Sequence, residues 1–388
     1  MQLEELGNHL RRGGAAILNH PATYAVANGA VIPPARYAGA NGSEFVFETR
    51  CIDGAFTTTA LVDSKQSQSN RSEVGLVEAR GEDGPASLIP MLSVAYPTVR
   101  LLDAQLPHRA FDAHIRASSH ADQPVVETAW YRALRDATHV DLSPLFTTSP
   151  VTLAFGGWDS SRKRGQLRLR SLYVSELFGV VSDGDGRVSR RSGGRLDPLG
   201  QDFHVSPDEF STLLDRQRAH MSETTVAKLE AALAKARKAK AGSDTLSAAA
   251  LGLGGVPPSP EAAYGVAVPE VQRARTYSLA GLRRLRFGGS AGEDVAARTA
   301  LLAILLLGAA YADADPEIRA YCDVAAPQGR VLLDDEMVEL DLSIESTGAF
   351  LRHAIDQLPE RLAWTGQVIE LIGDPALDRG AVSDDAEA

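Results

Sequence analysis

Seven hydrogen-bonding side chains follow one another from Ser64 to Asn70, and Arg71 closes the run. The run is too polar to be core, and Asp63 or Ser64 can serve as the N-cap of a helix that begins there. The first turns of that helix would carry Lys65, Gln66, Gln68 and Arg71. Such side chains, with the free amide groups of a helix start, suit phosphate and sugar oxygens better than an apolar ligand. A solvated helix face is the alternative, and the segment alone favours it.

A second polar stretch, Leu106 to Arg116, places His108 directly before Arg109. The pair suggests general acid–base chemistry. A histidine at a helix start is more often a hydrogen-bonded structural residue or an anion contact, and this is the interpretation we favour. The spacing puts Arg109 and Arg116 on one face of a short helix.

A third stretch, Leu153 to Gly165, sets Trp158 among small turn residues and continues into the cations Arg162 to Arg164. An indole beside cations suits single-stranded nucleic acid, because the ring can stack on a base for about 1 to 3 kcal/mol while the cations bind phosphates. A tryptophan that caps the core beneath a surface loop fits the same residues, so both interpretations stay open.

Metal and redox chemistry find little support in the sequence. Cys51 and Cys322 lie far apart with no zinc-type spacing, so neither a disulfide framework nor a metal site is predicted. Asp183 and Asp185 do not continue as an EF-hand loop, and the segment 182–187 is predicted to be a hairpin turn. We expect no cofactor, no metal and a cytoplasmic location.

The three stretches described above and a fourth, Arg170 to Gly179, occur in this order within the first half of the chain. Together they resemble the signature of the RAMP-superfamily backbone subunit of CRISPR interference complexes, in the GSU-type form of subtype I-G (formerly I-U). The segment Gly281 to Gly288 resembles a weaker fifth element. The resemblance implies RNA contacts at Ser64, Lys65, Gln66, Gln68, Asn70, Arg71, His108, Arg109, Arg116, Trp158, Arg162, Lys163, Arg164, Arg283, Arg284 and Arg286.

The resemblance also implies an α+β fold with a ferredoxin-like, RRM-related core, called the palm, and large insertions called fingers and thumb. Copies of such a subunit stack along the CRISPR RNA into a filament with the other Cascade subunits, the large subunit and a Cas five/six-type subunit. The loaded complex then pairs with target DNA, so specificity lies in the guide heteroduplex while the protein holds the backbone.

The overall charge of -11 argues against a nucleic-acid partner, but the charge is unevenly distributed. The segment 313–388 carries 18 acidic and 5 basic residues, whereas residues 1–312 carry 32 acidic and 34 basic ones. The acidic segment would have to face away from the RNA or contact a basic neighbouring subunit. Two local basic runs, 162–195 and 273–286, are compatible with a phosphate backbone, although many such runs are only solvated faces.

Hydrophobic periodicity and capping signals place the main elements. Strands are predicted over Glu44 to Cys51, Tyr96 to Leu102 and Val151 to Phe155. Helices are predicted from Ser206 to about His220, Glu223 to Lys240, Phe350 to Leu358, and over Glu293 to Ala312. The last of these has an apolar run too short to cross a bilayer, so we expect a buried helix and no membrane partner. The predicted regions are a core at 1–205, an insertion with a linker at 206–262, the rest of the core at 263–375 and an acidic, disordered tail at 376–388.

Three function classes follow. The first is a non-catalytic RNA-filament subunit, favoured by the ordered motifs. The second is a metal-dependent ribonuclease of the same superfamily, which could recruit Asp112, Asp159 or His108, but the sequence offers no paired carboxylates or metal-spaced histidines. The third is a protein scaffold without nucleic acid, which the basic runs and Trp158 disfavour. We expect the first class and no enzymatic activity.

Overall fold

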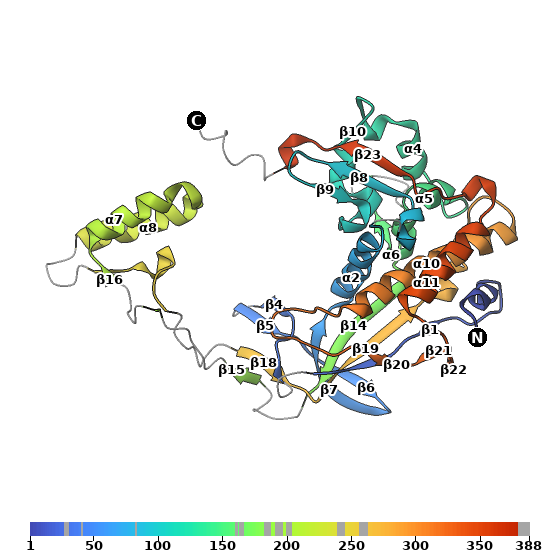
Figure 1. Ribbon diagram of the computed structural model, residues 1–388, viewed down its shortest axis with the longest axis horizontal. Helices are drawn as coiled ribbons and strands as arrows, with labels where there is room; N and C mark the ends of the chain where they lie inside the picture. The colour runs from blue at the N-terminus through green and yellow to red at the C-terminus, as the bar shows by residue number, and fades with distance from the viewer. Residues whose placement is uncertain are drawn as a thin grey trace. The chain divides into compact units, whose positions relative to one another are not determined.

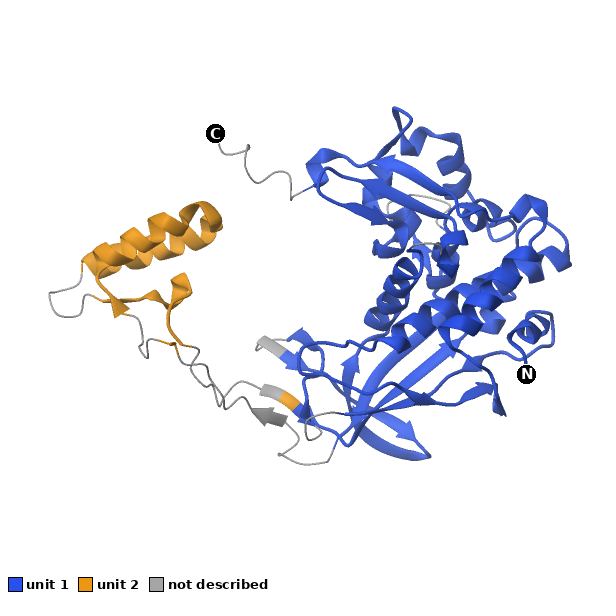
Figure 2. Cartoon of the chain, in the orientation of Figure 1, with its two compact units in different colours: residues 1–184, 266–388 blue, residues 185–265 orange. Residues whose placement is uncertain are grey.

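The computed structural model describes residues 1–26, 31–39, 42–81, 84–159, 162, 167–181, 188–190, 197–198, 204–238, 245–255 and 263–378. The chain divides into two compact units, one comprising residues 1–184 and 266–388 and the other residues 185–265 (Figure 2). Two predicted RNA contacts, Lys163 and Arg164, and most of the predicted tail lie outside the described residues.

An antiparallel sheet forms the base of the larger unit (Figure 1). In spatial order its strands are β22 (Glu336–Val338), β21 (Val331–Leu333), β1 (Leu18–Asn19), β19 (Glu270–Tyr277), β14 (Tyr173–Val180), β7 (Ala55–Asp63) and β6 (Phe47–Ile52). β2 (Ala22–Ala25) continues the line of β1 along β19, because Leu18 pairs with Tyr277 and Ala25 with Glu270. β20 (Gln328–Gly329) pairs with β2 in the same way that β21 pairs with β1.

The connections give this sheet a ferredoxin-like order. The chain passes from β1 and β2 to helix α2 (Lys65–Glu78), then through β14 and β19 to helix α10 (Ala291–Ala314), and ends the motif in β20 and β21. The four strand positions therefore lie in the order fourth, first, third, second, and all neighbours are antiparallel. This is the split β-α-β arrangement, and it confirms the predicted α+β class.

Alternation along the strands gives the sheet one buried and one open face. On β19, Val271, Arg273, Arg275 and Tyr277 are buried, whereas Ala274 between them is exposed. Arg275 meets Asp313 of α10, so the buried face is the one that the helices cover. Figure 1 shows α2 and α10 on the same side of the sheet, and α11 (Ile344–Asp356) packs along α10.

Helix α10 is the centre of the core, as its apolar sequence predicts. Ser290 and Glu293 form a capping box at its start, and residues 300–310 are all buried. By length and composition it could cross a membrane, yet 72% of its apolar window is buried inside the protein. Its position matches the prediction of a buried helix.

A second sheet lies beside the helices, with the spatial order β11 (Gln123–Pro124), β10 (Ser119–His120), β23 (Val368–Ile372), β8 (Met91–Ala95) and β9 (Arg100–Leu102). β8 and β23 pair in parallel, Met91 opposite Val368. The predicted strand at Tyr96 to Leu102 is shorter and begins at Arg100, because Tyr96 to Val99 form the turn from β8.

The segment between β9 and β14 contains short helices as well as short strands. Its helices are α3 (Ala113–Arg116), α4 (Ala129–Arg135), α5 (Ser143–Thr148) and α6 (Pro150–Phe155). The predicted strand at Val151 to Phe155 is wrong, because these residues form α6 with Pro150 at its first position. All six residues of α6 are buried, and a short run buried on every side gives no period that separates helix from strand.

Smaller elements complete the larger unit. β3 (Val31–Ile32) pairs with β18 (Ala263–Ala267), β4 (Arg36–Gly39) with β5 (Gly42–Phe45), and β12 (Gly157–Trp158) with β13 (Arg168–Leu169). Helices α1 (Leu6–His9) and α9 (Leu279–Leu282) flank the first strand and β19. The strand predicted at Glu44 to Cys51 corresponds to the end of β5 and most of β6.

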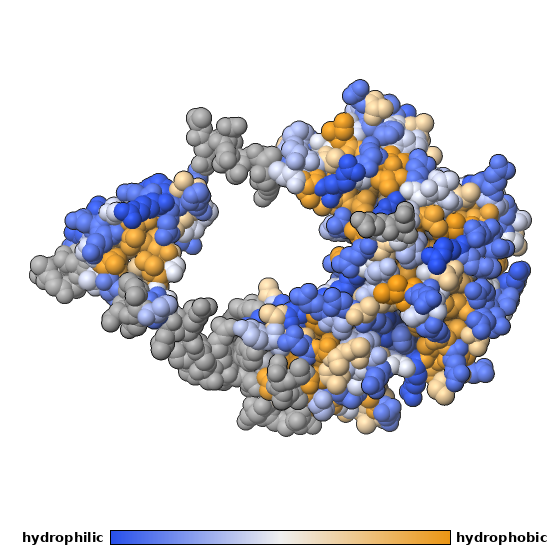
Figure 3. Space-filling model, in the orientation of Figure 1, coloured by the Kyte–Doolittle hydropathy of each residue, from blue (hydrophilic) through white to orange (hydrophobic). Residues whose placement is uncertain are grey.

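The smaller unit is a helical hairpin with short strands. It contains β15 (Val188–Arg190), β16 (His204–Val205), α7 (Pro207–Gln217), α8 (Glu223–Arg237) and β17 (Leu246–Ser247). Ser206 and Glu209 form the predicted capping box, and the core consists of Phe210, Leu214, Leu229, Leu233 and Leu251. Figure 3 shows hydrophobic residues of this unit bordered by hydrophilic ones. The insertion predicted at 206–262 lies inside this unit.

Candidate nucleic-acid interface

The polar run after β7 does form a helix, and Ser64 caps it. The Ser64 hydroxyl accepts a hydrogen bond from the amide of Ser67 at 3.3 Å. Lys65, Gln66 and Asn70 are exposed along the first turns of α2, as the sequence predicts. The helix start therefore presents a lysine and two amide side chains to solvent.

Two other predicted residues of the run point into the protein. Gln68 is 5% exposed, donates to Asp63 Oδ2 at 2.7 Å and accepts from Ser175 of β14 at 3.1 Å. Arg71 donates to the same Asp63 oxygen at 3.0 Å and to the carbonyls of Glu317 and Ile318. Both side chains tie α2 to neighbouring segments, so we leave them out of the candidate interface.

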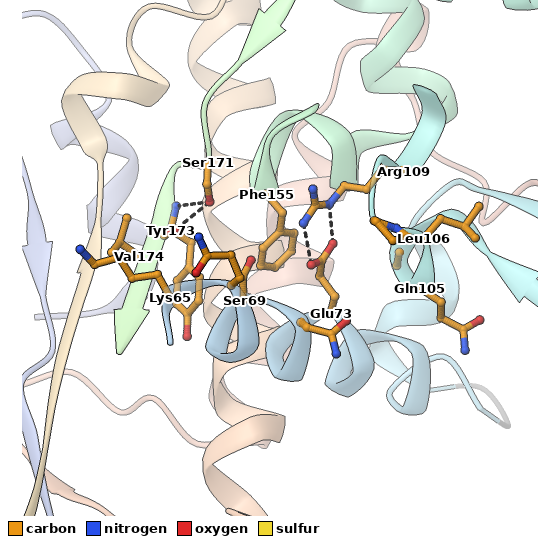
Figure 4. A pocket seen from close by; sticks show the side chains of 14 residues that line it. Lys65, Ser69, Glu73, Gln105, Leu106, Arg109, Phe155, Ser171, Tyr173 and Val174 are labelled. Carbon is orange, nitrogen blue, oxygen red and sulfur yellow. Dashed lines mark hydrogen bonds and ion pairs between the residues drawn. The ribbon is translucent and has the colours of Figure 1, made fainter. Parts of the chain in front are cut away.

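One pocket of about 480 Å³ gathers residues from all four ordered motifs, and we call it the α2 pocket (Figure 4). The first motif contributes Lys65, Gln66, Ser69 and Asn70, the second Leu106, Pro107 and Arg109, the third Phe155, and the fourth Ser171, Tyr173 and Val174. Glu73, Ala104 and Gln105 complete the lining. Segments that lie more than a hundred residues apart in the sequence thus meet at one place.

Arg109 and Glu73 form one wall of the α2 pocket. The guanidinium makes two hydrogen bonds to the carboxylate, with Nη2 and Oε2 at 2.6 Å, and a third to the carbonyl of Gly156 at 2.9 Å. Burial raises the pKa of Glu73, although Arg109 acts in the opposite direction. Arg109 is therefore held by the protein, and its backbone adopts a left-handed φ of 49° to reach this position.

The rest of the α2 pocket combines a polar rim with an aromatic floor. Phe155 and Tyr173 are buried beneath the exposed Gln66, Asn70 and Gln105. Lys65 lies at the rim, where its ammonium is 3.8 Å from Glu176. Amide and ammonium donors above aromatic rings can bind the edges and phosphates of unpaired nucleotides.

Arg116 and Arg162 meet in a second hollow, of about 400 Å³, that Arg135 and Asp159 also line. Arg116 donates to the carbonyl of Phe111 at 3.2 Å, and Arg162 donates to Asp136 at 2.6 Å. Two predicted cations from different motifs therefore share one surface hollow. Arg135 was not predicted to belong to it.

Trp158 lies at the surface, in the two-stranded ladder of β12 and β13. Its side chain is 42% exposed, and the guanidinium of Arg168 lies 4.6 Å from the ring centroid. Arg168 is its direct partner across the ladder. The exposed indole is not a cap of the core, and its stacking partner in this structure is a cation. Arg168 was missed because the pairing depends on a loop between the two strands.

The fifth, weaker element lies elsewhere in the larger unit, before α10. Arg283 donates to the carbonyls of His9 and Ala15 at 2.7 and 2.6 Å, and Arg286 donates to the carbonyl of Arg283 at 2.8 Å. Arg284 is exposed. None of the three lines the α2 pocket.

Of the three residues considered for metal-dependent cleavage, Asp112 has a structural role. Asp112 caps α3 and accepts from the amides of His108 and His114 at 3.1 and 3.0 Å. Asp159 is buried and His108 is exposed. Within the described ranges, no group of three or more His, Cys, Asp or Glu side chains is arranged to hold a metal ion.

Comparison with known proteins adds one finding. Residues 18–182 match the family model described as CRISPR-associated protein GSU0053. The matched region runs from β1 through β14 and contains every motif that lines the α2 pocket. A comparison with curated proteins gave no match to the chain.

Proposed function

Residues 18–182 of this chain are a CRISPR-associated region of the GSU0053 type, which gives the chain a role in CRISPR defence, and from this premise we propose that it binds CRISPR RNA. It would do so as a non-catalytic backbone subunit of a type I-G interference complex in the cytoplasm. Copies of the subunit would lie side by side along the RNA. Target DNA would then be recognised through pairing with the guide.

The observation that carries this proposal is the convergence of the four motifs on the α2 pocket. If each motif served only the element that contains it, the four motifs would have no reason to meet in one pocket. The pocket offers neutral amide donors and one lysine above two aromatic rings, which suits an RNA chain read by shape and backbone. Trp158 and the Arg116 and Arg162 hollow extend the candidate surface.

The decisive experiment is size-exclusion chromatography with absorbance at two wavelengths, on protein co-expressed with a CRISPR array and then treated with RNase. We expect a large species that retains RNA and protects short, regularly spaced fragments. A nucleic-acid-free monomer or dimer from cells that also supply the partner subunits would contradict the proposal.

The same preparation tests the ribonuclease alternative. Incubation with labelled RNA and a divalent metal should leave the RNA intact. Metal-dependent cutting that Asp159→Asn or Asp112→Asn abolishes would replace our proposal with the ribonuclease. Asparagine is the better substitution at position 112, because it can keep the cap of α3.

A further inference from the structure

A further cavity, of about 650 Å³, lies beside the start of α10 and is lined by the arginines Arg11, Arg12, Arg283, Arg286 and Arg298. We call it the arginine cavity. It shares no lining residue with the α2 pocket. Of these arginines, only Arg283 and Arg286 were predicted as site residues. Arg11 and Arg12 lie far from Arg298 in the sequence, so no local pattern groups them.

The inner arginines are held in place by carbonyl groups. Arg283 donates to the carbonyls of His9 and Ala15, and Arg298 donates to the carbonyl of Leu285 at 2.6 Å. A carbonyl fixes the position of a guanidinium but does not neutralise its charge. Both arginines are therefore oriented, and of the two only Arg298 also pairs with a carboxylate among the described residues, that of Asp294.

Asp294 is the one carboxylate among the described residues that line the cavity. It bonds Arg298 at 3.0 Å and the amide of Phe287 at 2.9 Å, and it lies 3.6 Å from Arg286. Glu293 is nearby, but it pairs with Arg361 at 3.0 Å and accepts from the amide of Ser290. The acidic groups thus balance only part of the cluster.

The crowding of like charges is visible at Arg298. Burial lowers the pKa of Arg298, and the charges of Arg286 and Arg283 lower it further, against the opposing effect of Asp294. A bound anion would relieve this repulsion. The guanidinium groups carry this argument rather than the helix start, since the Ser290 and Glu293 capping box already occupies part of the first turn.

Arg11 and Arg12 complete the cavity from the segment after α1. Both are exposed, and neither guanidinium bonds to any residue that the structure describes. Two solvent-facing arginines above three oriented ones would allow an anion to enter and to be bound on several sides.

We propose that the arginine cavity binds a phosphate group. Guanidinium groups match phosphate oxygens with paired hydrogen bonds, and such charge-assisted bonds are stronger than neutral ones. The phosphate could be carried by an RNA chain or by a small phosphorylated molecule, and both present the same chemistry. This inference does not depend on the function proposed for the α2 pocket.

The test uses the full chain with inorganic pyrophosphate as the probe. We expect pyrophosphate to raise the melting temperature at an ionic strength held constant with potassium chloride. In the double variant Arg11→Ala, Arg12→Ala the shift should disappear, with a loss of affinity of about tenfold or more. Arg352→Ala is the control, because Arg352 is exposed on α11 and does not line the cavity.

The two sources of phosphate are separated with one oligoribonucleotide made with a 5′-phosphate or a 5′-hydroxyl. If the double variant weakens binding of either RNA while Arg352→Ala does not, the cavity binds a phosphate of the RNA. If only the pyrophosphate response is lost, it binds a small ligand. If the double variant and Arg352→Ala behave alike with every probe, the inference is overturned, and the proposal for the α2 pocket is unaffected by that result.

Discussion

Glu73 of α2 and Arg109 of the second motif form a buried ion pair with two hydrogen bonds, which joins two segments 36 residues apart in the sequence. The carboxylate is 4% exposed and the guanidinium 13%. Arg109 is thus a structural member of the α2 pocket wall, and the free donors of that pocket lie on its rim.

Replacing Arg109 by alanine should destabilise the fold. The change would leave Glu73 buried without a partner, for which we expect a loss of about 3 to 5 kcal/mol in the free energy of unfolding. Urea unfolding measures this difference. Arg352→Ala, on the exposed face of α11, should change the free energy by less than about 0.5 kcal/mol. If Arg109→Ala kept the stability of the wild type but bound RNA more weakly, Arg109 would instead be a residue that contacts RNA.

Lys65 and Gln66 should affect RNA binding in different ways. Lys65→Ala should weaken binding to all sequences and reduce the salt slope by about 0.7, because one phosphate contact is lost. Gln66→Ala should weaken binding without changing that slope, since the amide carries no charge. Gln357→Ala, an exposed glutamine at the end of α11, serves as the control. Titrations at several salt concentrations would disprove the assignment if both slopes stayed at the wild-type value.

Trp158 should contribute by stacking. Trp158→Ala is expected to cost about 1 to 3 kcal/mol of RNA affinity at an unchanged salt slope, whereas Trp158→Phe should retain part of it. The indole already carries Arg168 on its ring, so Arg168→Ala should lower affinity and reduce the slope. Fluorescence quenching of wild-type protein and the Trp158 variants by RNA provides the measurement. Equal quenching in wild type and in Trp158→Phe would count against stacking at this residue.

Asp103 should make stability depend on pH. It is fully buried, it lies 2.5 Å from the Ser149 hydroxyl, and burial raises its pKa to about 7 while its hydrogen bonds oppose the rise. In the unfolded chain the pKa returns toward 3.8. Between pH 3.8 and about 7, the Asp103 carboxyl is therefore protonated in the folded protein and ionised in the unfolded chain. Its contribution to the free energy of unfolding is greatest below pH 3.8 and falls as the pH rises toward 7.

The matched variant Asp103→Asn removes this titration. We expect the stability of wild type relative to Asp103→Asn to fall by up to about 1.4 kcal/mol per pH unit within that window and to level off above it. Chemical unfolding at a series of pH values measures the difference. A constant difference across the window would show that Asp103 keeps one charge state.

The sequence predicted elements whose signals are local. The buried helix α10, the capping box of Ser206 and Glu209 and the cap at Ser64 all depend on neighbouring residues, and all three are found. The α+β class also followed, through the resemblance. The helix α6 was mistaken for a strand because its six buried residues show no period.

The residues of the candidate site were predicted less completely than the helices and their caps, and the reason is physical. A basic side chain in a motif can serve a phosphate in solvent or a carboxylate in the core, and the sequence does not distinguish these two partners. Arg71 forms an ion pair with Asp63, and Arg109 with Glu73, whereas Lys65 and Asn70 are exposed. Arg11 and Arg12 line one cavity with Arg298 only because the chain folds back over nearly three hundred residues, which no local pattern records.

The parallel pairing of β8 with β23 has a consequence for synthesis of the protein. β8 lies early in the chain, but one of its two neighbours is complete only at Ile372. On the ribosome, the apolar strand β8 therefore has one unpaired edge until β23 has been translated. Chains that stop before Val368 would keep that edge unpaired, which exposes them to aggregation and proteolysis, so the late strand favours chains that extend past Ile372 in the folded pool.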